Sequence, residues 1–179
     1  WWAVDNVTVR APFTKVAEKP NTIIDVISDP QDDPEDYKLA IRRLNAMPEK
    51  AGALVINGDL VDNGSQEQWD KFLAAREEAP HDSGVELWTI GNHEMYGKET
   101  SEVHMQRFLK YSGQDKPWNE VVVNGTPLIS VNTEYYSDID RGGKEPFQRI
   151  SAEQLQWLDE RLAHWDAQGV TALVFTHPL

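Results

Sequence analysis

The stretch LVINGDLVDNG, residues 54–64, decides the fold of this chain, because it can be interpreted in two incompatible ways. Asn57-Gly58 between two apolar runs is a strong local signal for a β-hairpin. Asp59 and Asp62, however, directly follow the first run, where the end of a rigid strand would hold carboxylate oxygens for a cation. The sequence around this stretch decides between a hairpin turn and a ligand-bearing loop.

Short apolar runs alternate with segments of helical period from residue 21 onwards, which is typical of βαβ units on a parallel sheet. The apolar runs predict buried strands at residues 22–28, 52–57, 85–90 and 170–176. Helices are predicted at residues 34–47, from Ser65 onwards, at 100–113, and from Ser151 to Gly169. Ser65 and Ser151 are each followed three residues later by glutamine, which predicts capping boxes at both helix starts.

A second Asn-Gly pair, Asn124-Gly125, lies in a different setting. The runs on either side of it are rich in β-branched residues and have no helical period. Here the sequence predicts a true β-hairpin, which adds antiparallel strands to the parallel series.

The composition excludes several classes of function. Thirty acidic against 17 basic residues give a net charge of -13, which argues against a nucleic-acid backbone or an anionic membrane surface as the main partner. The chain has no cysteine, so any metal must bind through oxygen or imidazole nitrogen. No apolar run approaches the roughly 18 residues that a membrane span needs. One domain with a sizeable core is expected from 179 residues of which 40% are hydrophobic.

Polar side chains follow each of the four predicted buried strands. The segments are SDPQ (28–31), GDLVD (58–62), GNHE (91–94) and THP (176–178). Each segment alone has an ordinary explanation, such as a turn at Asp29-Pro30 or a solvated imidazole at His177. In open α/β sheets, however, the carboxyl ends of parallel strands share one edge, where ligands bind. Four such segments at one edge therefore indicate a site.

The chemistry of these side chains favours metal ions. Carboxylates, an amide oxygen and an imidazole suit Mn, Fe or Zn without any thiolate. Two such metals can hold a phosphate ester while a metal-activated water attacks phosphorus. His93, next to Asn92, is positioned in the sequence to meet the charge on the phosphate or to protonate the leaving oxygen.

These segments, together with ISAEQLQWLDERLAHWDAQGVTALVFTHP (150–178), resemble the calcineurin-like metallophosphoesterase superfamily over residues 22–179. The resemblance implies an α/β fold, an α/β/β/α sandwich of two packed mixed sheets flanked by helices. It makes Asn57-Gly58-Asp59 a strand-to-loop turn and the hairpin interpretation wrong. It also implies two divalent or trivalent metal ions, Mn, Fe or Zn, whose ligands would be Asp29, Gln31, Asp59, Asn92 and His177.

The same resemblance assigns roles within this set. Asp59 would bridge the two metals, His93 would act on the substrate, and Asp62 would steady His93. The family's first motif usually reads Asp-x-His, so the amide of Gln31 would weaken the first site or favour a harder cation.

A final Gly-His-x-His motif, which gives each metal a histidine in the family, does not occur before Leu179. The expected domain at residues 21–179 is therefore incomplete at its C-terminus. His81, His104 and His164 are not natural replacements, because one precedes a strand and two fall within predicted helices.

Residues 1–20 fit this scheme poorly and are interpreted as the tail of a preceding β-domain or a linker. The segment WWAVDNVTV (1–9) resembles the closing strand of secreted jelly-roll carbohydrate-binding domains. Further domains on one or both sides are therefore expected. An exported bacterial protein is the expected localisation, with the cytoplasm as the alternative.

The function predicted from the sequence is metal-dependent hydrolysis of a phosphomonoester or phosphodiester. The alternative is a catalytically impaired scaffold, binding module or fragment of the same fold. The phosphate-ester substrate itself is left open, since loops over the site would select it. Residues 140–149 are either a rim segment that faces the substrate or an exposed solvated loop.

Overall fold

Strand β2 (Ala53–Asn57) lies in the middle of a parallel sheet, and this position settles how the stretch LVINGDLVDNG folds. It pairs in parallel with β1 (Ile24–Ile27) on one side and with β3 (Glu86–Thr89) on the other. A hairpin at Asn57-Gly58 would need an antiparallel partner directly after the turn. The hairpin interpretation is therefore wrong for this pair, and β2 ends in a loop.

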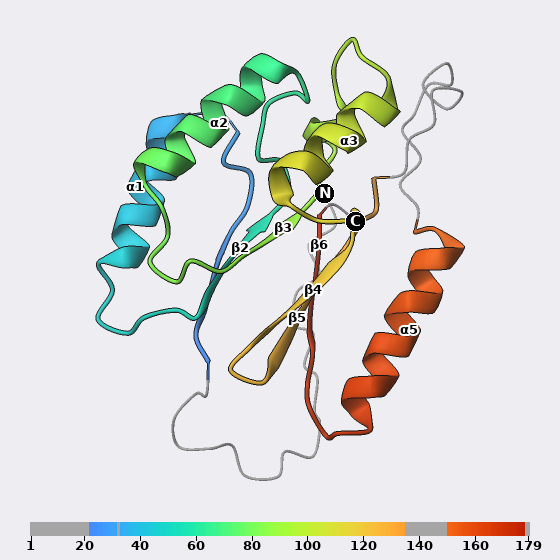
Figure 1. The fold of residues 1–179 in the computed structure, drawn as a ribbon. Helices are drawn as coiled ribbons and strands as arrows, with labels where there is room; N and C mark the ends of the chain where they lie inside the picture. Colours follow the sequence, from blue (N-terminus) through green and yellow to red (C-terminus); the bar gives the residue numbers. More distant parts are fainter. Residues whose placement is uncertain (1–21, 32, 135–149, 178–179) are drawn as a thin grey trace, which may run out of the picture.

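The computed structural model describes residues 22–31, 33–134 and 150–177, and it contains a second sheet of three strands (Figure 1). Strands β4 (Asn119–Val123) and β5 (Thr126–Val131) are antiparallel, whereas β6 (Leu173–Thr176) runs parallel to β5. The predicted hairpin at Asn124-Gly125 joins β4 to β5, with positive φ angles of 50° and 81° at the two turn residues. This prediction is confirmed.

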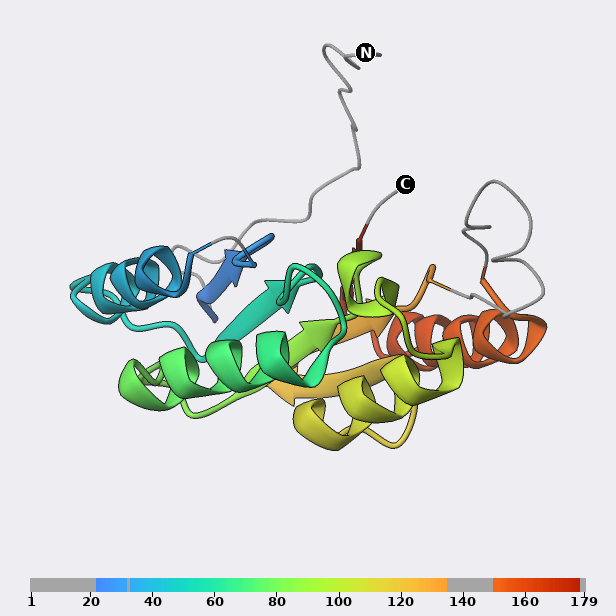
Figure 2. The same cartoon turned by 90° about the horizontal axis from the view of Figure 1, so that it is seen from above.

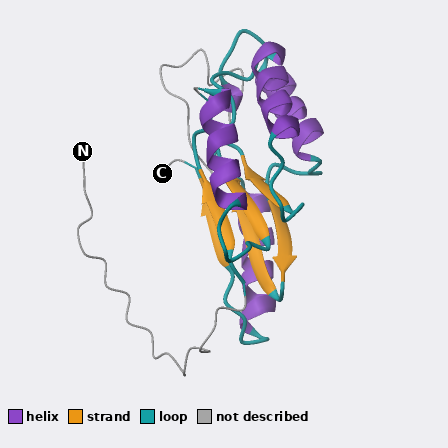
Figure 3. Cartoon of the chain, turned by 90° about the vertical axis from the view of Figure 1, so that its left-hand side faces the viewer, coloured by secondary structure: helices purple, strands orange, loops and turns teal. Residues whose placement is uncertain are grey.

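Helices surround the strands on several sides. Helices α1 (Pro34–Asn45), α2 (Gln66–Glu78) and α3 (Ser101–Ser112) follow β1, β2 and β3 in the chain, and α5 (Ala152–Asp166) precedes β6. A short 3-10 turn, η1 (His93–Met95), lies between β3 and α3. Helices α1 and α2 lie next to each other near the first sheet, while α5 lies beside the second sheet (Figures 1 and 2). Figure 3 shows the strands grouped together among these helices.

Strand β2 explains how the two sheets are joined. Its side chains alternate between two faces, as in any strand. Leu54 and Ile56 join a buried cluster with the aromatic side chains that come from the helices and β3. Ala53 and Val55 join a second cluster with Leu87, Val123 and Leu128, the last two from β4 and β5. The first sheet is thus covered by helices on one face and by the second sheet on the other, which confirms the predicted two-sheet α/β fold.

Local signals set several helix ends as predicted. Ser151 Oγ accepts the backbone N–H of Gln154 (3.1 Å) at the start of α5, and α3 ends at Gly113, which has a left-handed φ of 71°. The second half of the predicted capping box does not form, because Gln154 Oε1 accepts the N–H of Asn132 (2.7 Å). The capping box predicted at Ser65 is wrong. The Ser65 side chain makes no cap hydrogen bond, and its backbone N–H instead donates to Asn63 Oδ1 (3.1 Å).

Two strands that were predicted to be buried are partly exposed. Val26 in β1 is 51% exposed, and Leu173 and Val174 in β6 are 40% and 46% exposed. Strands β1 and β6 stand at the ends of the strand orders among the described residues, so each has one neighbouring strand. Strand β6 also joins the second sheet instead of extending the parallel series. An apolar run predicts a strand but not its neighbours or its place in the sheet, which accounts for both corrections.

Among the described residues, no helix is both long and apolar enough to cross a membrane. The segments predicted at residues 1–20 and 140–149 lie outside the described part of the chain.

Candidate metal centre

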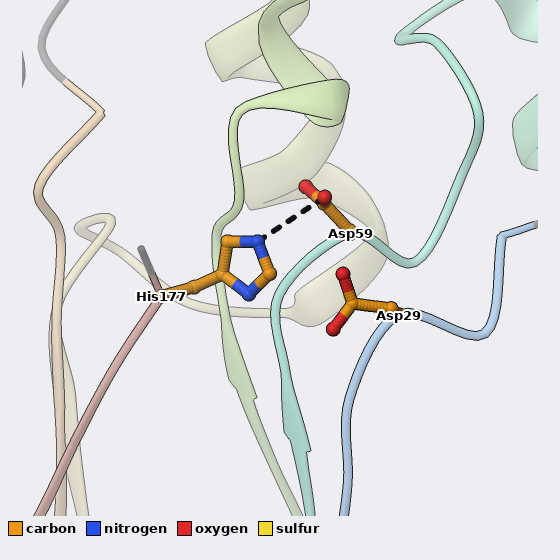
Figure 4. A group of neighbouring side chains, drawn as sticks. All are labelled: Asp29, Asp59 and His177. Atoms are coloured by element: carbon orange, nitrogen blue, oxygen red, sulfur yellow. Dashed lines mark ion pairs between the residues drawn. The ribbon is translucent and has the colours of Figure 1, made fainter. Parts of the chain in front are cut away.

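Three candidate ligands meet where strands of both sheets end. Asp29 follows β1, Asp59 follows β2, and His177 directly follows β6. One oxygen or nitrogen atom of each lies within 4.8 Å of those of the other two, and Figure 4 shows the three side chains facing one another. The two sheets therefore bring together side chains that are far apart in the sequence.

The backbone at both carboxylates has an uncommon conformation. Asp29 has a φ of 57° and Asp59 a φ of 51°, both in the left-handed region. The Asp29 N–H donates to Gly58 O (3.1 Å), which ties the loop after β1 to the loop after β2. Aspartate tolerates this region better than most residues, but such positions persist only where the surrounding structure fixes them.

Two glycines make room for the cluster. A Cβ at Gly58 would lie 2.3 Å from His177 Cγ, and a Cβ at Gly91 would lie 2.2 Å from Asp59 Oδ1. Atoms cannot approach so closely, so any larger residue at either position would displace a candidate ligand. The backbone of GNHE therefore packs directly against Asp59.

His177 and Asp59 form an ion pair. His177 Nε2 lies 3.1 Å from Asp59 Oδ2, and His177 Nδ1 lies 2.7 Å from the backbone oxygen of Asn57. Burial alone would lower the pKa of His177, but the hydrogen bond and negative charge of Asp59 outweigh it and raise the pKa to about 9. Burial likewise acts to raise the pKa of Asp59, yet the hydrogen bonds from His177 and the His93 N–H lower it overall.

The cluster has the properties that a divalent cation requires. Among the described residues, no lysine or arginine forms a salt bridge with Asp29, Asp59 or Asp62, and the ion-pair partners of Asp59 and Asp62 are histidines, which can themselves bind metal. Gln31 Oε1 is buried and accepts no hydrogen bond from the described residues. Oxygen and imidazole donors of this kind fit Mn, Fe or Zn. The residues present therefore fit a metal site.

His93 lies beside this cluster. Its backbone N–H donates to Asp59 Oδ1 (2.9 Å), and its Nε2 lies 3.9 Å from Asp59 Oδ2. Its Nδ1 is 2.7 Å from the backbone oxygen of Asp62, so Nδ1 carries the proton that forms this hydrogen bond. Asp62 thus contacts His93 mainly through its backbone, since its carboxylate oxygen is 3.9 Å from Nδ1.

The other two candidate ligands, Gln31 and Asn92, belong to the same loops but make different contacts. Gln31 and Asp62 line a cavity of about 410 Å³ together with Tyr37, Lys71 and Phe72. The Asn92 side-chain nitrogen donates to the hydroxyl oxygen of Tyr96 (2.9 Å). The structure thus groups Asp29, Asp59 and His177 directly, with the His93 N–H in contact with Asp59, Gln31 in the loop after β1, and Asn92 in the loop after β3.

Sequence reasoning missed Glu94, which holds two of these loops together. Its carboxylate is fully buried and accepts four backbone N–H groups, from Asp59 (3.0 Å), Leu60 (2.7 Å), Val61 (3.1 Å) and Gly91 (2.6 Å). Burial and the charge of Asp59 raise the pKa of Glu94 to about 7, although the backbone hydrogen bonds oppose this shift. The available signal was an acidic residue inside GNHE, directly after an apolar strand.

The fold and this cluster define an α/β protein with a candidate metal centre at the strand ends of two packed sheets. The chain belongs to the calcineurin-like phosphoesterase family, whose model matches residues 23–177. The predicted family is thereby confirmed.

A solved structure has a similar fold. It is a dimetal phosphatase from Danio rerio, which matches with a TM-score of 0.62 and 16% sequence identity over 89% of this chain and 70% of that chain. At this identity the likeness concerns the fold alone. A search of curated proteins finds no match.

Proposed function

We propose that this chain is a phosphoesterase that hydrolyses its substrate at a pair of metal ions bridged by Asp59. The observation that carries the proposal is the convergence of Asp29, Asp59 and His177, with ligand atoms within 4.8 Å of one another. Membership of the calcineurin-like phosphoesterase family supports the reaction class. The pair of metals and the role of each residue are our proposal.

One metal would be held by Asp29, Gln31 and Asp59, and the other by Asp59, Asn92 and His177. Manganese, iron and zinc all suit these oxygen and nitrogen donors. Metal ions in such a pair neutralise the charge of a phosphate ester and lower the pKa of a water molecule. The negative charge of Asp59 offsets the repulsion between the two cations.

His93 would protonate the leaving oxygen. The proton on Nδ1 is donated in a hydrogen bond to the Asp62 backbone oxygen. Nε2 is therefore the atom that would exchange protons with the substrate. In the reaction a bond would form between phosphorus and a water oxygen, that water would release a proton to solvent, and the ester P–O bond would break. A proton on His93 Nε2 would pass to the leaving oxygen, and His93 would then take a proton from solvent.

The test compares turnover of phenyl phosphate and its bis ester in the presence of Mn²⁺, because the basic phenoxide leaving group needs a proton. His93→Ala should lower kcat by roughly 100-fold or more, because a proton donor is lost, while Mn²⁺ content stays that of the parent. His164→Ala is the control, since His164 is an exposed histidine on α5 that contacts Trp165 and Gln168. It should leave turnover unchanged.

Two outcomes would contradict the proposal. Equal turnover in the parent and in His93→Ala would remove His93 from the mechanism. A parent that binds Mn²⁺ but hydrolyses neither ester would favour the alternative, a binding module that keeps the fold without the reaction. The ratio of the two rates in an active parent would decide between monoester and diester preference.

A further inference from the structure

The side chain of Tyr96 contacts two polar residues of the segment that precedes it, Asn92 and His93. Its hydroxyl oxygen accepts a hydrogen bond from Asn92 Nδ2 (2.9 Å). Its ring lies against the His93 imidazole, with ring centroids 4.9 Å apart and an interplanar angle of 45°. We propose that Tyr96 is a positioning residue, whose hydroxyl holds the Asn92 amide and whose ring holds the His93 imidazole. The inference rests on the proposed function, in which Asn92 binds metal and His93 transfers a proton.

The backbone fixes the direction from which Tyr96 reaches these residues. The η1 turn ends at Tyr96, and its N–H donates to His93 O (3.1 Å). Its carbonyl oxygen accepts the N–H of Gly64 (2.8 Å), which belongs to the loop between Asp59 and α2. Tyr96 is thereby tied to two of the loops that carry candidate site residues, those after β2 and β3.

The hydrogen bond to Asn92 has a direct consequence for a cation. A side-chain amide has one oxygen, which can bind a metal, and one nitrogen, which cannot. The hydroxyl of Tyr96 occupies the nitrogen end, so Asn92 Oδ1 stays available. Partners of this kind, one step removed from the metal, orient ligands and commonly change metal affinity when they are removed.

Packing of a core does not account for Tyr96. Its side chain is 39% exposed, so the ring is held at the surface against the site. The contact with His93 limits the orientations that this half-exposed imidazole can adopt, because one side of the ring is covered. The two contacts predict separable effects, one on metal affinity and one on turnover.

The first variant, Tyr96→Phe, removes the hydroxyl and keeps the ring. We expect its dissociation constant for Mn²⁺, measured by electron paramagnetic resonance of free Mn²⁺, to rise about tenfold. Tyr111→Phe is the matched control, because the Tyr111 hydroxyl accepts a hydrogen bond from Gln66 Nε2 (2.6 Å) on α2, outside the ligand loops. This control should bind Mn²⁺ as the parent does.

The second variant, Tyr96→Leu, removes the hydroxyl and the ring together. Its Mn²⁺ affinity should equal that of Tyr96→Phe, because the same hydrogen bond is lost. Its kcat at saturating Mn²⁺ should fall several-fold below that of Tyr96→Phe, because only this variant frees the imidazole of His93. Equal kcat values in the two variants would overturn the role of the ring.

The inference and the proposed function fail in different ways. If the parent and Tyr96→Phe bind Mn²⁺ equally well, the inference is wrong while the metal centre stands. If the parent binds no Mn²⁺, the proposed function is wrong, and the nuclear magnetic resonance signals of the Asn92 side-chain amide test the contact in metal-free protein. A shift of these signals in Tyr96→Phe but not in Tyr111→Phe supports the inference, and unchanged signals overturn it.

Discussion

The Nε2 atom of His177 lies 3.1 Å from Oδ2 of Asp59, and this ion pair joins the loop after β6 to the loop after β2. The two strands belong to different sheets. We propose that His177 and Asp59 both bind metal. In the metal-free protein, a proton on His177 Nε2 lies between these two side chains instead. This proton links the stability of the metal-free protein to pH.

The free energy of unfolding of the metal-free chain should fall as the solution becomes alkaline. The pKa of His177 is raised from 6.5 to about 9, because Asp59 outweighs the opposing effect of burial. A raised histidine pKa means that the folded state binds the proton more tightly than the unfolded state. The stabilisation is therefore complete below pH 6.5 and is lost as the pH rises through about 9. Urea denaturation in the presence of EDTA at several pH values measures this free energy of unfolding.

The partner carboxylate supplies the control for this experiment. Asp59→Asn removes the charge that raises the pKa of His177, so its stability should vary less between pH 6.5 and 9 than that of the parent. An identical pH dependence in the two proteins would show that the ion pair does not control stability in this range.

Metal content should depend on Asp59 and not on Asp62. Asp59→Asn keeps the shape of the side chain but removes the charge that would bridge two cations, so we expect both metals to be largely lost. Asp62→Asn is the matched control, since Asp62 contacts His93 through its backbone oxygen. The metal content of both variants is measured by elemental analysis, after loading with Mn²⁺ and removal of free metal by gel filtration. Parent stoichiometry in Asp59→Asn would contradict the bridged pair.

Glu94→Gln should destabilise the fold by about 2 to 3 kcal/mol, because a side-chain amide nitrogen cannot accept the backbone N–H groups that now face a carboxylate oxygen. Urea denaturation measures the change. Glu102→Gln makes the same substitution at an exposed carboxylate on α3 that contacts Gln106, and should leave stability unchanged. A similarly small loss of stability at both positions would show that Glu94 does not hold the loops after β2 and β3 together.

Gly91→Ala should reduce both stability and metal binding. The new Cβ would lie 2.2 Å from Asp59 Oδ1 and 2.9 Å from His177 Cδ2, so both side chains must move. Overpacking of this kind costs roughly 1 to 3 kcal/mol. Gly113→Ala introduces backbone strain without displacement, because Gly113 has a left-handed φ of 71° but no atoms lie within 4 Å of its Cβ position. That variant should lose stability and still bind Mn²⁺ like the parent.

The convergence of Asp29 and Asp59 was predictable, because each follows an apolar run that forms a strand. Parallel strands of one sheet bring their carboxyl ends to the same edge, so position after a strand carries information about distant neighbours. His177 joins them by a different route, since β6 belongs to the second sheet and reaches the site through the packing of the two sheets. The neighbours of β6 were not predictable, because a run of four apolar residues does not specify which strand it pairs with.

Glu94 and Tyr96 were missed for a different reason. A fully buried carboxylate and a surface glutamate look the same in a single sequence, and only the fold shows that Glu94 accepts four N–H groups. The contact of Tyr96 with Asn92 depends on the η1 turn between them, which no pattern in GNHEMY predicts.

Asn57 links the two sheets at the point where the site forms. Its side-chain nitrogen donates to Thr176 O (3.0 Å), and its backbone oxygen is 2.7 Å from His177 Nδ1, across sequence separations of 119 and 120 residues. Contacts between such distant residues carry a loop-closure cost, and during synthesis they need His177 to have emerged. A nascent chain that has emerged only as far as β3 would therefore hold Asp29 and Asp59 without their imidazole partner. Tight metal capture would mark the moment at which β6 docks, and so would report the assembly of the two sheets during synthesis.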